Sequence, residues 1–131
     1  MGIETLNDTI KYQDGKGVSR EAGVVVVARG IVDLASDVSL AAAGSDGDAT
    51  EPVGGISAGT YIFDLLIGEG DSPELALERL APDGATWIAI DGLDALSSDF
   101  APGPVTIGQG ATLRLVNTSV NSVAGVYARL S

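Results

Sequence analysis

Hydrophobic and polar positions alternate along several short stretches of this chain, which is the period-two pattern of a half-buried β-strand. The clearest case is GTYIFDLLIGEG (59–70), where glycines bound an eight-residue strand-like run. In that run Tyr61, Phe63, Leu65 and Ile67 fall on one face. The pattern predicts a strand that turns those four side chains toward a core.

The C-terminal part of the chain repeats the alternation in GQGATLRLVN (108–117) and in the closing AGVYARLS (124–131). The side chains predicted to face inward are Leu113, Leu115, Val126, Ala128 and Leu130. Those predicted to face outward are Thr112, Arg114, Tyr127 and Arg129. Both segments are therefore predicted to be strands with one buried face.

The stretch LALERLAPDGATWIAI (75–90) can be interpreted as a helix followed by a strand, or as one hairpin. Pro73 and Pro82 leave room for only about two helical turns. The PDG sequence between the halves is typical of a turn, because proline presets φ and glycine adopts the left-handed conformation. We predict a β-hairpin with arms 75–80 and 85–90, and the helix remains the alternative.

Glycine and proline, 18 and 5 residues, separate the other segments at intervals of about ten residues, as in all-β folds. Residues 32–44 and 104–108 supply shorter candidate strands, 44–55 is predicted to be a loop, and 93–100 could form one helical turn. The chain is predicted to be all-β, an antiparallel β-sandwich or jelly roll with an extended N-terminal arm.

The first twenty-two residues are polar and punctuated by glycine, so we assign 1–22 to the arm and 23–131 to a single sandwich domain. Residues 23–30, GVVVVARG, form an apolar run between glycines. Such a run suits a strand that is buried on both faces or lies in an interface.

Composition excludes much of the common chemistry. The chain contains no His and no Cys, which removes the commonest general base, the thiol nucleophile and nearly every zinc, copper or iron–sulfur site. The net charge of −11 disfavours nucleic-acid and anionic-membrane partners. No basic-then-apolar leader is recognisable, so we expect the translated chain to be the mature one, made in a cytoplasm.

Two candidate sites fail on closer inspection. Asp46, Asp48 and Glu51 lack the remaining ligand and flanking helices of an EF-hand. A glycosidase carboxylate pair would have to use Asp64 and Glu78, both predicted to face solvent. We expect no catalytic residue, no metal site and no cofactor.

The single tryptophan, Trp87, could belong to an exposed sugar-binding platform. With only six aromatic residues in the chain, a place in the core is the simpler prediction, and Trp87 is the expected anchor of that core.

The order GTY strand, hairpin with PDG-x-x-W, GxGATLR and closing GxYAxLS, over residues 58–131, resembles small β-sandwich virion proteins of tailed bacteriophages. The similar proteins are of the capsid decoration (cement) and head-fibre type. The resemblance implies a jelly-roll-like domain, often a homotrimer, that binds the major capsid protein on the outer surface of the virion. It also implies assembly in the bacterial host cytoplasm and stabilisation of the shell by bridging capsomers.

We expect capsid contact to lie in the arm, with residues 23–28 supporting it as a strand. A frayed terminus followed by an ordinary core strand is the alternative. The expected capsid-contact residues are Ile3, Leu6, Ile10, Lys11, Tyr12, Lys16 and Arg20. The expected oligomer interface comprises Arg114, Val126, Tyr127 and Arg129, in the C-terminal third of the chain, where no acid follows Asp99.

Two other functions remain open. One is a carbohydrate-recognition module of a phage fibre, which would expose aromatic rings beside Asp or Asn on one face. The other is a tail or baseplate subunit, which the composition fits equally well.

Overall fold

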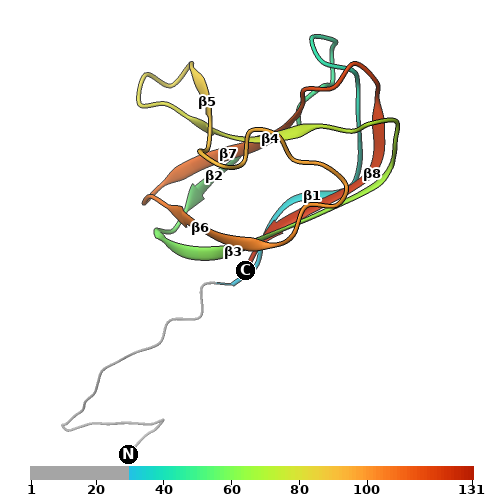
Figure 1. The fold of residues 1–131 in the computed structure, drawn as a ribbon. Helices are drawn as coiled ribbons and strands as arrows, with labels where there is room; N and C mark the ends of the chain where they lie inside the picture. The colour runs from blue at the N-terminus through green and yellow to red at the C-terminus, as the bar shows by residue number, and fades with distance from the viewer. Residues whose placement is uncertain (1–29) are drawn as a thin grey trace, which may run out of the picture.

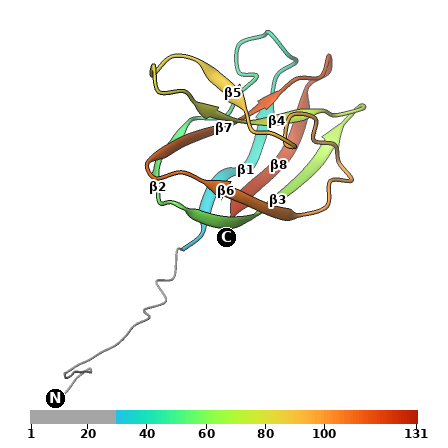
Figure 2. The same cartoon turned by 60° about the vertical axis from the view of Figure 1, so that its left-hand side comes forward.

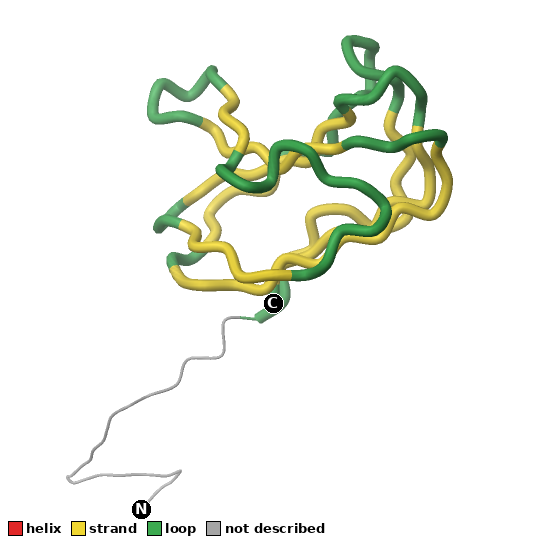
Figure 3. Tube along the Cα trace, viewed as in Figure 1, coloured by secondary structure: helices red, strands yellow, loops and turns green. Residues whose placement is uncertain are grey.

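The computed structural model describes residues 30–131, which contain eight β-strands and no helix (Figures 1 and 3). The first four strands are β1 (Val32–Leu40), β2 (Val53–Ile56), β3 (Gly59–Gly70) and β4 (Leu75–Leu80). The last four are β5 (Trp87–Ala89), β6 (Gly103–Ile107), β7 (Ala111–Asn117) and β8 (Val123–Leu130). The all-β prediction is confirmed.

The strands form two antiparallel four-stranded sheets that pack on one another (Figure 2). Sheet A has the order β1-β8-β3-β6, and sheet B has the order β2-β7-β4-β5. Strand neighbours therefore include the first with the last, the second with the seventh, the third with the sixth and the fourth with the fifth. This is the wrapping of an antiparallel ribbon that makes a jelly roll.

The core lies between the sheets and is built mainly from leucines that occupy alternate positions along the strands. Leu75, Leu77, Leu113 and Leu115 of sheet B are wholly buried. They pack against the inward side chains of sheet A, which are Leu34, Tyr61, Phe63, Ile67, Val105, Ile107, Val126, Ala128 and Leu130. The predicted alternation is confirmed in β3, β7 and β8. Each fully buried large apolar side chain contributes on the order of 1.5–3 kcal/mol relative to an exposed one.

The predicted hairpin at 75–90 is confirmed, with β4 pairing to β5 through Leu80 and Trp87. The loop is longer than predicted, because β5 begins only at Trp87. The Ala81 amide donates to the Thr86 carbonyl at 2.7 Å, which closes the loop, and Gly84 has a φ of +73°. The left-handed glycine is the turn residue that the PDG sequence indicated.

Three expectations were wrong. Residues 93–100 form no helical turn; Leu96 makes an isolated bridge to Leu75 and is buried. The end of the expected 44–55 loop is strand β2, which pairs with β7 despite its two glycines. Trp87 is only half-buried and does not anchor the core, whose large aromatic side chains are Tyr61 and Phe63.

The loop between β4 and β5 contains a carboxylate whose titration can be tested. The Asp83 carboxylate accepts hydrogen bonds from the Thr86 hydroxyl at 2.6 Å and from the Thr86 and Ala85 amides, each at 2.9 Å. These bonds favour the charged form and lower the pKa of Asp83 from 3.8 to about 2. Since the folded pKa is depressed, the stabilisation of the loop is present above about pH 4 and is lost as pH falls through 2.

We predict that an NMR titration of the Asp83 carboxyl carbon will give a pKa near 2, and that Thr86→Ala will raise it toward 3.8, because the strongest of these hydrogen bonds is removed. Ser97→Ala serves as the control, since the Ser97 hydroxyl donates to Asp99 and not to Asp83. An unchanged Asp83 pKa in Thr86→Ala would contradict the assignment.

Candidate functional site

The outer face of sheet A, which is turned away from sheet B, combines charged side chains with exposed apolar ones. Strand pairing sets Asp33 of β1 and Asp64 of β3 on either side of Arg129 in β8. In the next outward row along the strands, Tyr127 of β8 lies beside Leu66 of β3. We call these five residues the A face.

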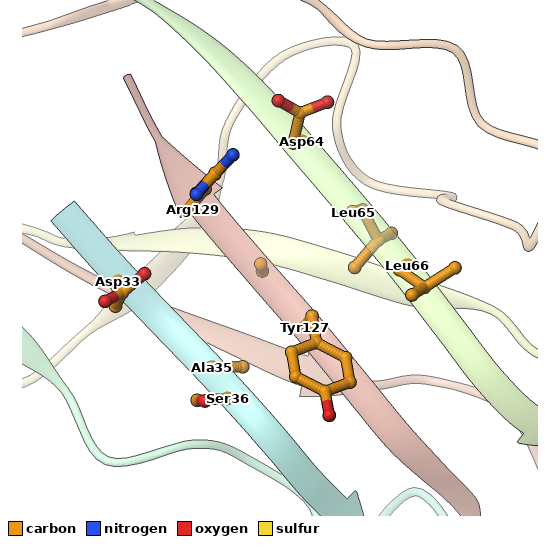
Figure 4. Close-up of a pocket in the computed structure, with 9 residues that line it drawn as sticks. Asp33, Ala35, Ser36, Asp64, Leu65, Leu66, Tyr127 and Arg129 are labelled. Carbon is orange, nitrogen blue, oxygen red and sulfur yellow. The ribbon is translucent and has the colours of Figure 1, made fainter. Parts of the chain in front are cut away.

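The A face is hollowed over β1, β8 and β3, as Figure 4 shows, with a volume of about 420 Å³. Arg129 and Tyr127 stand on β8 between the two carboxylates and Leu66 (Figure 4). Beyond Tyr127, the facing positions of β3 and β8 are Gly68 and Gly125. Cβ atoms added at either glycine would lie 3.2–3.3 Å from the backbone of the other. The floor there is therefore bare backbone.

Exposed apolar side chains gather on the same side of the sandwich. Leu66 and Tyr127 are 59% and 44% exposed, and Ile62, one outward row on the other side of Asp64, is 43% exposed. Ile31, at the entrance to β1, is 60% exposed. Four of the six exposed large hydrophobic residues in the described chain thus lie on or beside sheet A's outer face, as expected of a binding surface.

The charges on the A face are unbalanced. Two carboxylates and one guanidinium give a local charge of −1, and Arg129 makes no ion pair within residues 30–131. Its exposed guanidinium has donors left for a group outside the described protomer. The A face can therefore bind by mixed apolar and charged contacts.

Sheet B shows the opposite situation on its own outer face. Arg114 Nε donates to Glu78 Oε1 at 2.8 Å, and the Arg114 guanidinium lies 4.3 Å from the ring centre of Trp87. Both the charge and the ring are satisfied within the protomer by an ion pair and a cation–π contact. This cluster therefore has its charged and aromatic partners within the protomer.

The structure separates the four residues expected in an oligomer interface. Tyr127 and Arg129 lie together on the A face, whereas Arg114 is on the other sheet in the cluster just described. Val126 is wholly buried in the core, so its side chain is not available to a partner. Its position follows from the strand alternation, which puts Val126 and Tyr127 on opposite faces.

The expected capsid-contact residues, Ile3, Leu6, Ile10, Lys11, Tyr12, Lys16 and Arg20, lie outside the described residues, as do 23–28 and the arm itself. The described chain begins just before β1. Because Val32 pairs with Leu130, the start of β1 lies at the end of sheet A, beside the C-terminus (Figure 2).

Sequence reasoning missed Asp33, Asp64 and Leu66 as members of a site. Asp64 and Leu66 occupy outward positions of a strand whose inward face was recognised, so their exposure followed from the pattern. The pattern could not predict which residues of β8 lie beside them, because that depends on a pairing between segments about sixty residues apart.

Residues 30–131 contain no group of three or more acidic side chains placed to hold a metal ion. The same residues include no helix long and apolar enough to cross a membrane. No family model, curated protein or solved structure matches this chain.

The sheet B cluster predicts how the fluorescence of Trp87, the only tryptophan, will behave. Arg114→Ala should uncover the indole and raise the acrylamide quenching constant, while lowering stability by about 1 kcal/mol or less, because the ion pair is partly exposed. Arg129→Ala, the matched control on sheet A, should leave quenching unchanged. Equal quenching in Arg114→Ala and in the unsubstituted protein would show that the guanidinium does not cover the ring.

Proposed function

We propose that the protein is a structural virion component that binds the outer surface of a phage capsid and stabilises the shell by bridging capsomers. The observation that carries the proposal is the jelly-roll topology of residues 30–131, in which the chain leaves the leading residues directly into β1 of sheet A. The resemblance of residues 58–131 to decoration and head-fibre proteins supports the phage setting.

The proposal assigns different roles to the leading residues and to the jelly roll. The leading residues supply the capsid contact, and their three early positive charges, Lys11, Lys16 and Arg20, attract acidic groups on the shell. The jelly roll remains outside, where its acidic surface faces solvent. Binding energy then comes from many repeated weak contacts on a symmetric lattice.

The proposal predicts that the full chain sediments with purified heads of the phage that encodes it. Replacing Lys11, Lys16 and Arg20 together by Glu should reduce the bound fraction at least tenfold, since three attractive charges become repulsive. Arg79→Glu is the control, because Arg79 is exposed and belongs to β4 of sheet B, whereas the leading residues precede β1 of sheet A.

Sedimentation with detached tails but not with heads would instead assign the protein to the tail or baseplate. Binding to neither particle would refute the proposal. Binding of the triple variant at the level of the unsubstituted chain would move the contact away from the leading residues.

A second candidate, a carbohydrate-recognition module, is favoured by one observation. Tyr127 is 44% exposed and lies one outward row along the strands from Asp33, Asp64 and Arg129, which line the same hollow. An exposed ring can stack on the apolar face of a sugar, and carboxylate and guanidinium groups can bond its hydroxyls.

This candidate predicts binding on an array of bacterial surface polysaccharides that Tyr127→Ala weakens at least tenfold, because the stacking surface is lost. Trp87→Phe is the control, since Trp87 lies on the other sheet under Arg114. An array without signal, or a signal that Tyr127→Ala leaves unchanged, would exclude a sugar site on the A face.

A further inference from the structure

We propose that the A face binds the A face of a second copy of this chain, about a two-fold axis that runs between β8 and β3, parallel to the strands. The proposal does not depend on a capsid partner. It concerns the contact between copies.

The geometry of the two strands makes the A face self-complementary. A two-fold rotation about an axis along the strands keeps the position of each residue along the axis and exchanges the two sides. Within one copy, each residue of β8 has a cross-strand partner in β3. In the dimer, that β8 residue faces the same β3 residue of the second copy. Arg129 therefore meets Asp64 of the second copy, and Tyr127 meets Leu66.

Both juxtapositions are favourable, and each occurs twice. Two guanidinium–carboxylate pairs form in a partly desolvated face, where they are stronger than in water. Two aromatic–aliphatic contacts bury side chains that are 44% and 59% exposed in the protomer. The bare backbone at Gly68 and Gly125 leaves space beside the Tyr127 ring.

The comparison between two arginines identifies the occupant as a second copy. Arg114 has its carboxylate and its aromatic ring within the protomer. Arg129 has an aromatic ring and a carboxylate on the same face but no ion pair within residues 30–131. In the two-fold contact, Asp64 of the second copy supplies the carboxylate for Arg129.

The size of the face indicates how tight this contact can be. Four strands about 4.8 Å apart, over roughly nine residues at 3.3 Å each, present on the order of 550 Å² per copy. About 1,100 Å² in total is near the lower end for specific interfaces. We therefore expect a dissociation constant in the micromolar range, at an ionic strength that screens the net charge of −11.

Charge exchange between two variants tests the contact, with association measured by sedimentation velocity from micromolar to millimolar protein. Arg129→Asp and Asp64→Arg should each self-associate at least tenfold more weakly than the unsubstituted chain, because like charges then face one another. An equimolar mixture of the two variants should form a heterodimer, since each arginine again faces an aspartate. An effect confined to one protomer could not be restored by mixing.

Two controls protect the interpretation. Arg79→Asp makes the same charge change on sheet B and should leave dimerisation unchanged. Tyr127→Ser, at an exposed position, should weaken dimerisation without altering the unfolding transition, and it replaces the charge variants if either fails to fold.

A monomer at millimolar concentration, a stable trimer, or a mixture of charge variants that remains monomeric would each overturn the two-fold contact. Head binding is measured separately, so loss of the dimer with head binding intact rejects only this inference. A dimer without head binding rejects only the capsid proposal.

Discussion

The structure depends on strand β8, the last in the chain, pairing between β1 and β3. Its inward residues, Val126, Ala128 and Leu130, are buried against sheet B, and its outward residues, Tyr127 and Arg129, form the centre of the A face. A single alternating sequence therefore builds the core and presents the surface. Because the side-chain period is two, a shift of one residue in register would exchange the two sets and destroy both.

The jelly-roll wrapping extends this constraint to the rest of the chain. Because β1 pairs with β8, at the opposite end of the described chain, the sheet A ladder requires long-range pairing. Such pairing forms slowly during folding. The same closure puts the beginning of β1 beside the C-terminus, at one end of sheet A.

Local pattern was enough to predict what depends on neighbours in sequence: the strands with strict alternation, the PDG turn and the all-β class. It was not enough where distant pairing decides. β2 is a strand because β7 lies beside it, although Gly54 and Gly55 are poor strand residues. Leu96 is buried through its bridge to Leu75. Trp87 lies on the outer face of sheet B instead of in the core, and the β4–β7 pairing places Arg114 of β7 over its ring.

The same limit applies to the A face. Asp33, Asp64 and Arg129 come from three segments that only the sheet brings together, and each is unremarkable alone. Once assembled, they lie one outward row along the strands from the exposed Tyr127 ring. Burial of the exposed apolar area of such a rigid surface lowers the free energy. In the proposed two-fold contact, each copy buries the A face of the other with residues that the chain already contains.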